Sequence, residues 1–233
     1  MRILMVLCQI AKRQKQRQRL RDMKERTSMA LFSDADELRI SEAIAAAERT
    51  TSGEIVAVVT AASESYFYVP FMWAAIAALL VPWPLIYLTW WPMHVTYFAQ
   101  LATFLILVLL LMPRTVRVGL VPRSIKRSHA HRRAVEQFLS QSLHTTAGRT
   151  GVLIFVSVAE RYAEVLADSG INAKVPEGTW QGIVDHLTTD LADGRAVDGF
   201  VHAIEMAGMH LAKHFPPGSG DPNELPDHLI VLD

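Results

Sequence analysis

The longest apolar segment of this chain is residues 65–113, which contain no Asp, Glu, Lys or Arg. A helix that crosses a bilayer needs about 20 mostly apolar residues. The segment supplies two such lengths, roughly Tyr66–Leu88 and Val95–Met112, separated by a polar, tryptophan-rich interruption at residues 89–94. A soluble protein could bury one such helix, but two in succession with charged sequence on both sides predict a transmembrane helical hairpin.

A capped helix and an apolar strand precede the hairpin. Ser33 is followed three residues later by Asp36, which is close to a capping box, and the neighbouring acids favour the positive end of a helix dipole. Leu38, Ile40 and Ile44 recur at helical spacing after it. Residues 54–60 are then apolar at nearly every position, as expected of a strand covered on both faces.

Strands and helices also follow the hairpin. The patterns predict strands at Gly151–Ser157, Tyr162–Asp168 and Leu229–Leu232, and helices at about Thr179–Ala192 and Val197–His214. Neither side of the hairpin could bury its apolar strands alone, so the two sides should form one α/β domain around the inserted hairpin. The prediction is a small mixed sheet between helices, with the first two strands parallel and the third antiparallel after a tight turn at Glu160.

The charges are distributed unevenly along the chain. Residues 1–133 hold 18 of the 23 Lys and Arg residues but only 9 of the 23 acids, and the hairpin tip has no basic residue. The positive-inside rule then places both termini and the soluble domain in the cytoplasm of a bacterium, with the hairpin in its inner membrane. The basic segment 114–133 is interpreted as an anchor near anionic headgroups. Nucleic acid is not expected as a partner, because no aromatic residues are interleaved with these charges.

The composition divides the chain into six segments. Residues 1–28 are interpreted as a basic, disordered or mis-started N-terminus, with Met23 or Met29 as alternative starts. The remaining segments are the first part of the α/β domain at 29–62, the hairpin at 65–113, the basic segment at 114–133, the second part of the domain at 134–215 and a C-terminal tail at 216–233.

The order of these elements resembles the TPM domain family, named after a thylakoid lumen protein, a photosystem II repair protein and a nematode modulator of acetylcholine receptors. The resemblance covers roughly Leu31–Thr60 and Arg149–Phe215. It rests on the acid-capped helix running into Ser52-Gly53-Glu54-Ile55-Val56, on Gly151-Val152-Leu153-Ile154 followed by Glu160-Arg161, on Asp168-Ser169-Gly170-Ile171, and on the last helix pair with breaks at Gly194 and Gly199.

The resemblance implies a sheet of about four strands between helices. Some family members are described as acid phosphatases and others as assembly or repair factors for membrane complexes, and calcium binding is associated with the fold. This sequence departs from the family's Gly-x-Gly-Leu-Glu run, because Asp168 replaces its first glycine and Asn172 its acid. Any binding loop built on those two positions is therefore altered.

Four residues are candidates for site chemistry. Asp168 and Glu160 flank the third strand, and Asp168 with Asn172 offers oxygen ligands of the kind that calcium or magnesium needs. An Asp in the sequence Asp168-Ser169-Gly170 is equally explained as a turn residue. Arg161 beside Glu160 is explained either as a turn ion pair or as a planar clamp for an anion.

No motif of a known catalytic class is present. The sequence has no Gly-x-x-x-x-Gly-Lys-Ser/Thr, Gly-x-Ser-x-Gly or Cys-x-x-Cys run. The spans carry no Asp, Glu, Lys or Arg, which argues against an ion pathway. We therefore expect a membrane interaction module that helps to assemble or maintain a membrane complex, with the bilayer and another membrane protein as partners. The alternative is a divalent-metal-assisted phosphatase, with Asp168 and Glu160 as candidate metal ligands and Arg161 on the phosphate.

Overall fold

The computed structural model describes residues 32–146, 148–217 and 225–232. The predictions for residues 1–28 and for most of the C-terminal tail lie outside these ranges. The described chain divides into two compact units. Residues 63–130 form one unit, and the residues on either side of them form the other, which we call the α/β domain.

The first helix, α2 (Asp34–Glu48), begins as the sequence predicts. Ser33 caps it, since its side chain accepts a hydrogen bond from the Asp36 backbone N–H while the Asp36 carboxylate accepts one from the Ser33 N–H at 2.9 Å. This reciprocal pair satisfies two donors that the first helical turn leaves without partners. Ile40 and Ile44 of α2 are fully buried, so the cap fixes where the helix meets the core.

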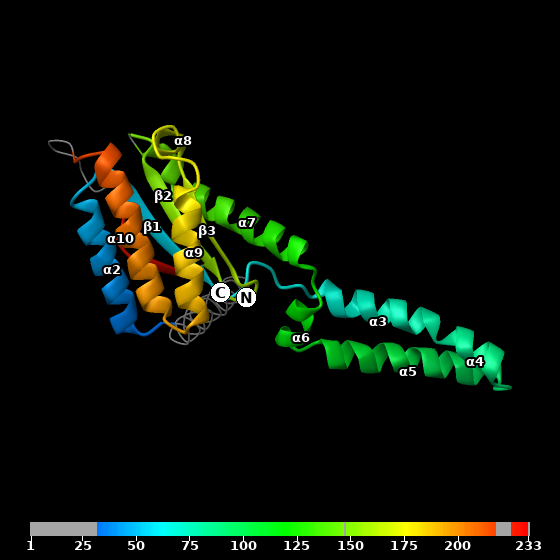
Figure 1. Ribbon diagram of the computed structural model, residues 1–233. Helices are drawn as coiled ribbons and strands as arrows, with labels where there is room; N and C mark the ends of the chain where they lie inside the picture. The colour runs from blue at the N-terminus through cyan, green and yellow to red at the C-terminus, as the bar shows by residue number, and fades with distance from the viewer. Residues whose placement is uncertain (1–31, 147, 218–224, 233) are drawn as a thin grey trace, which may run out of the picture. The chain divides into compact units, whose positions relative to one another are not determined.

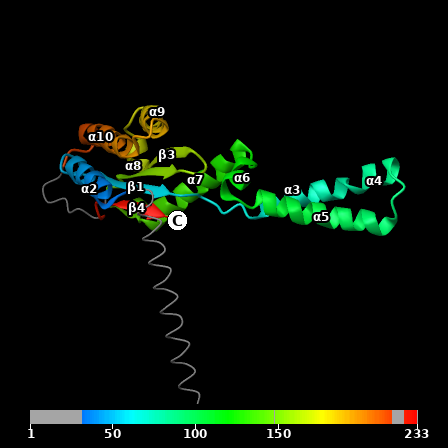
Figure 2. The ribbon, with the colours of Figure 1, turned by 90° about the horizontal axis from the view of Figure 1, so that it is seen from below.

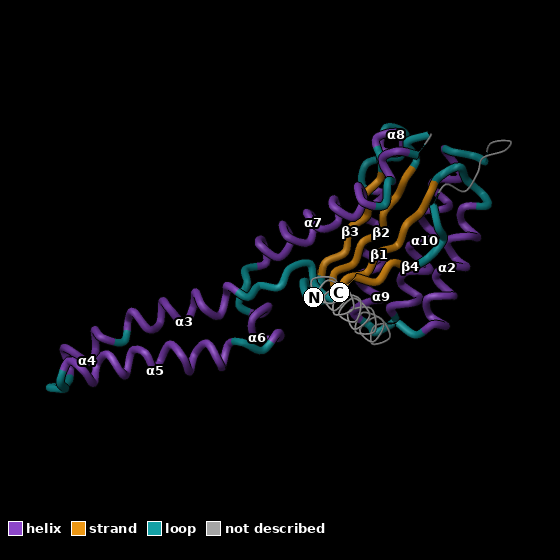
Figure 3. Tube along the Cα trace, turned by 180° about the vertical axis from the view of Figure 1, so that it is seen from behind, coloured by secondary structure: helices purple, strands orange, loops and turns teal. Residues whose placement is uncertain are grey.

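The α/β domain contains a four-stranded mixed sheet, with strand order β3-β2-β1-β4 (Figure 3). Its strands are β1 (Glu54–Thr60), β2 (Gly151–Ser157), β3 (Tyr162–Ala167) and β4 (Leu229–Leu232). The pairing of β1 with β2 is parallel, in a register that joins Glu54 to Gly151, and β4 is also parallel to β1. Strand β3 is antiparallel to β2. The structure confirms the predicted mixed sheet, including the parallel first pair.

Successive side chains of the central strands point alternately into two hydrophobic cores, one on each face of the sheet. One face of β1, with Ile55, Ala57 and Val59, packs against α2, α9 (Thr179–Ala192) and α10 (Ala196–His214). These three helices lie together on one side of the sheet (Figures 1 and 2). Val56 and Val58 point to the other face, where the core includes residues of α7 (Arg123–Ser140) and the short 3-10 helix η1 (Leu143–Thr145). Burial on both faces explains why β1 reads as a continuous apolar run.

The connection from β1 to β2 contains the whole second unit. It consists of α3 (Tyr68–Leu80), α4 (Pro82–Leu88), α5 (Met93–Leu111) and α6 (Arg114–Gly119), followed by the start of α7. Helices α3 and α4 follow each other directly, and α5 packs back against them as a hairpin. Tyr68–Leu88 and Met93–Leu111 are both long and apolar enough to cross a membrane.

Two features of the hairpin helices, a break in the first span and close packing of α3, follow from their sequence. The break between α3 and α4 falls at Val81, immediately before Pro82, because prolines 82 and 84 lack the N–H that continues a helix. Ala74 and Ala78 are buried, so small side chains allow α3 to approach its neighbour closely.

Arg117 of α6 is buried at the base of this unit. Its guanidinium carbon lies 4.1 Å from the centre of the Phe67 ring, and the residue is 8% exposed. A cation above an aromatic face is stabilised by the ring quadrupole. The predicted basic segment 114–133 forms helix α6 and the first part of α7. One of its arginines, Arg117, packs inward instead of facing solvent.

Candidate ligand pocket

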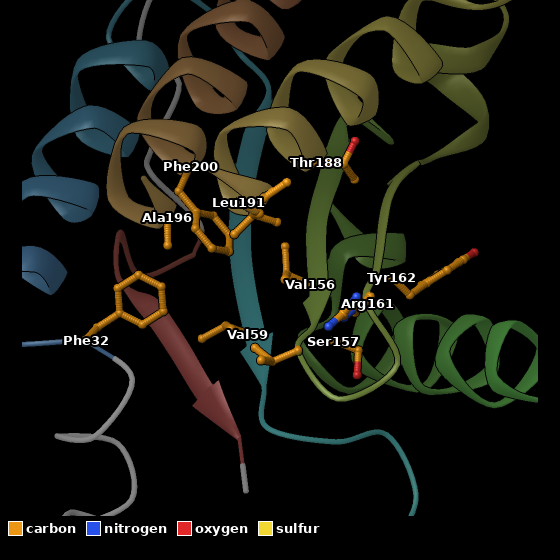
Figure 4. Close-up of a pocket in the computed structure, with 12 residues that line it drawn as sticks. Phe32, Val59, Val156, Ser157, Arg161, Tyr162, Thr188, Leu191, Ala196 and Phe200 are labelled. Carbon is orange, nitrogen blue, oxygen red and sulfur yellow. The ribbon is translucent and has the colours of Figure 1, made fainter. Parts of the chain in front are cut away.

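A pocket of about 530 Å³ opens in the α/β domain where the parallel strands β1 and β2 end. Val59 of β1 and Val156 and Ser157 of β2 form its floor (Figure 4). In open α/β sheets, ligands bind beyond the carboxyl ends of parallel strands, because the connections diverge there. The volume falls within the range of about 300–1,000 Å³ that is usual for small-molecule sites.

Most of the pocket wall is apolar. Phe32, just before α2, packs edge-to-face against Phe200 of α10, with the ring centres 5.9 Å apart. Leu191 and Ala192 at the end of α9, together with Ala196 at the start of α10, complete this wall. The wall is built by the α9–α10 turn, so it depends on the packing of these helices over the sheet.

Three polar lining residues direct their side chains to partners within the protein. The Ser157 hydroxyl donates to the buried carboxylate of Glu160. The Thr188 hydroxyl donates to the Val184 carbonyl at 2.8 Å, within α9. The Tyr162 hydroxyl donates to Glu164 at 3.1 Å and points away from the pocket (Figure 4).

Arg161 is the cationic lining residue. It occupies the turn between β2 and β3 with φ of 51°, a left-handed conformation that tightens the turn. Its guanidinium lies beside Val156 and Ser157 (Figure 4). None of the ion pairs found among the described residues involves Arg161. The predicted turn ion pair with Glu160 is therefore not formed in that part of the chain.

Asp168 and Asn172 lie at the opposite end of β3. Asp168 is the N-cap of the short helix α8 (Ser169–Asn172), where its carboxylate accepts the Ser169 N–H at 2.6 Å. Strand β3 is six residues long and separates Asp168 from Glu160 by about 20 Å. These two carboxylates therefore cannot share one metal ion, which corrects the pairing expected for a metal-assisted phosphatase.

The side chains around Asp168 fit a structural role better than a calcium or magnesium site. Asn172 donates to the Ala167 carbonyl at 2.8 Å and accepts the indole N–H of Trp180 at 3.1 Å, so both ends of its amide are used. One Asp168 oxygen, Oδ2, is buried without a hydrogen-bond partner. Calcium takes six to eight oxygen ligands. Across the described ranges, no group of three or more His, Cys, Asp or Glu side chains is placed to hold a metal ion.

Another acidic group, which is partly buried, is not predicted by the sequence. Glu48 at the end of α2 accepts the Ile55 N–H at 2.7 Å through Oε1. Its other carboxyl oxygen, Oε2, is buried without a hydrogen-bond partner, and the carboxyl group of Asp227 lies nearby. Burial, followed by the neighbouring carboxyl groups of Asp227 and Glu54, raises the pKa of Glu48 to about 9. The spacing of residues in the sequence does not indicate this contact, because Glu48 and Asp227 are more than 170 positions apart and meet only through the pairing of β4 with β1.

Comparison with known proteins identifies the fold. Residues 114–210, from α6 into α10, match the model of the TPM domain family. The NMR structure of BA42 protein from the psychrophilic bacterium Bizionia argentinensis has the same fold, with a TM-score of 0.55 and 23% sequence identity. The alignment covers 86% of this chain and 95% of BA42. No curated protein matches the sequence significantly.

The family match and the sheet agree with each other. Strands β1 and β4 lie outside the matched residues, but β1 pairs with β2 along its whole length and β4 pairs with β1, so both belong to the same sheet. The resemblance seen in the sequence is thereby confirmed. Residues 114–210 match the TPM domain family, and the chain shares the fold of BA42.

Proposed function

We propose that this protein is a membrane-anchored interaction module, in which the TPM domain binds a partner during assembly or maintenance of a membrane complex. The observation that carries the anchor is the exposed apolar surface of the hairpin. In an apolar stretch of 18 residues within each span, only 22% of the first and 11% of the second is buried within the described part of the protein. A core helix of a soluble protein would be mostly buried, so these spans need an apolar environment from outside the chain.

The distribution of side chains on the hairpin supports a bilayer as that environment. Leu79, Leu109 and Leu110 are each more than 60% exposed, and Tyr97 and Phe98 are equally exposed. Trp90 and Trp91 lie at the connection between the helices, where an interfacial aromatic belt belongs. The 19 residues of α5 extend about 28 Å, close to the thickness of the hydrocarbon core.

The charges support an orientation with the domain in the cytoplasm. Arg114, Arg123, Lys126 and Arg127 follow the second span, whereas the connection at the other end has no basic residue. Short loops rich in Lys and Arg stay on the cytoplasmic side. Accordingly, we place the protein in a bacterial inner membrane as a two-span protein with both termini in the cytoplasm.

The pocket favours binding over catalysis. The hydroxyls of Ser157 and Thr188 donate to neighbouring groups, and the candidate metal ligands lie at the other end of β3. A phosphatase that uses one metal ion needs its ligands and its anion clamp together. We therefore keep the phosphatase only as an outcome of the experiments.

Insertion of the hairpin predicts a specific labelling pattern in intact cells. With Cys8 replaced by Ser, the variants Asp36→Cys and Glu205→Cys should both resist a membrane-impermeant maleimide until the membrane is opened. Trp90→Cys at the hairpin tip should react from outside the inner membrane. Labelling of Asp36→Cys and Glu205→Cys from opposite sides, or a chain that stays soluble without detergent, would contradict the proposal.

The interaction role is tested by photocrosslinking in membranes. A photoreactive residue in place of Val158, which lies at the pocket and is 45% exposed, should yield one discrete crosslinked protein. The same residue at Leu139 of α7, which is 52% exposed and away from the pocket, is the matched control and should not. The opposing result is hydrolysis of a generic phosphomonoester with calcium or magnesium that is lost in Asp168→Ala, with no crosslink at residue 158.

A further inference from the structure

The residues that line the pocket restrict the class of ligand that it can bind. Arg161 is the charged member of the lining set, and its guanidinium is turned toward the cavity beside Val156 (Figure 4). Across the described residues it has no carboxylate partner, whereas the lining hydroxyls donate to groups of the protein. A planar guanidinium binds carboxylate and phosphate oxygens through paired N–H donors. An anionic group is therefore the complement to this end of the pocket.

The rest of the cavity selects an apolar body. Phe32, Val59, Leu191 and Phe200 face the space beyond Arg161. A fully polar anion, such as inorganic phosphate, would leave these side chains in contact with water and gain nothing from them. An alkyl chain would remove them from water, and this burial is favourable in proportion to the apolar area covered.

We propose that the pocket binds a small amphiphilic anion, with its carboxylate or phosphate head on Arg161 and a single alkyl chain between the sheet and the α9–α10 turn. The cavity of about 530 Å³ suits a small ligand. This inference deepens the proposed function, because it names the chemistry of the group that the TPM domain recognises.

The test measures binding of water-soluble probes to the full chain in a detergent-free amphipathic polymer. Equilibrium dialysis with octanoate and with octyl phosphate should show one saturable site per chain. Octanol and octyltrimethylammonium carry the same chain without a negative head, and they should bind at least tenfold more weakly. Whichever anion binds more tightly identifies the head group, and equal binding of all four probes would refute the proposal.

Arg161→Gln is the first variant. Loss of a charge-assisted hydrogen bond should weaken binding of the anionic probe by about 10- to 100-fold and leave octanol unchanged. Arg149→Gln is a matched control, because Arg149 is also exposed and also has a left-handed φ, of 50°, but lies at the other end of β2. An equal loss in both variants would show that the head is held by general charge and would exclude the Arg161 site.

A second pair of variants tests the chain-binding part. Thr188→Trp places an indole over the cavity and should abolish saturable binding of both anions, while Thr189→Trp, at the next exposed position outside the lining, should not. Unchanged binding in Thr188→Trp would refute the assignment of the cavity. A negative binding result can be distinguished from a failure of the membrane-anchor proposal. Dialysis can also be run on a chain that proves soluble without detergent.

Discussion

Replacing Glu48 by Gln is expected to stabilise the α/β domain at alkaline pH and to have little effect at pH 5. The native protein holds a proton on Glu48 up to a pKa of about 9, whereas an unfolded chain loses it near the ordinary glutamate pKa of 4.5. Between these values the native state binds more protons than the unfolded state. Stability therefore falls as pH rises through this window, by up to about 1.4 kcal/mol per pH unit.

Glutamine removes this dependence without losing the bond to the backbone. Its carbonyl can still accept the Ile55 N–H, and its neutral amide places no negative charge beside Asp227. We expect a gain of about 2 to 3 kcal/mol at pH 8, after allowance for relaxation around the carboxylate.

Thermal unfolding of the full chain in mild detergent, measured from pH 5 to pH 9, tests this expectation. The wild-type melting temperature should fall across the range and that of Glu48→Gln should stay nearly level. Glu42→Gln, at an exposed position on the same helix, should follow the wild type. Parallel curves for the wild type and Glu48→Gln would show that Glu48 does not titrate in this window.

The sheet could be predicted from the sequence because its signals are local. Strands β1 and β2 are apolar along their whole length, which requires cover on both faces, and cover is possible only if the two strands share one sheet. Ser33 and Asp36 likewise mark the start of α2 within a few residues. Each of these expectations depends on neighbours in the chain.

The pocket could not be predicted in the same way. Phe32, Leu191 and Phe200 line it only because α9 and α10 fold over the end of β1, and the pattern of each helix says which side is apolar but not which strand end it reaches. Glu48 meets Asp227 through the pairing of β4 with β1, which joins distant parts of the chain.

The pairing of Asp168 with Glu160 as metal ligands is wrong for a local reason. The two residues flank a strand, and an extended strand separates its two ends by about 3.3 Å per residue. They therefore lie beyond the two opposite ends of β3. Asp168 also shows what the altered family run does here: it caps α8, while the retained Gly170 lies where a Cβ would come within 2.6 Å of the Arg149 carbonyl oxygen.

Gly151→Ala is expected to destabilise the domain strongly. A Cβ at this position would lie 2.5 Å from the Leu143 carbonyl oxygen and 2.9 Å from a Leu143 methyl carbon. Backbone cannot yield as a flexible side chain can, so β2 or η1 must move. Gly151 pairs with Glu54 at the start of β1, and its carbonyl accepts the Asp168 N–H at 2.9 Å, so a shift disturbs both neighbouring strands. We expect a loss of about 3 kcal/mol.

Gly182→Ala is the matched control, because a Cβ at that position in α9 would meet nothing within 4 Å. Alanine has the higher helix propensity, so this variant should gain about 1 kcal/mol. Thermal unfolding under the same conditions compares the two. Similar melting temperatures for both variants would mean that β2 and η1 can separate at little cost. The β1–β2 pairing, which joins the two parts of the domain across the hairpin, would then tolerate displacement, and the split fold would be less constrained than its register indicates.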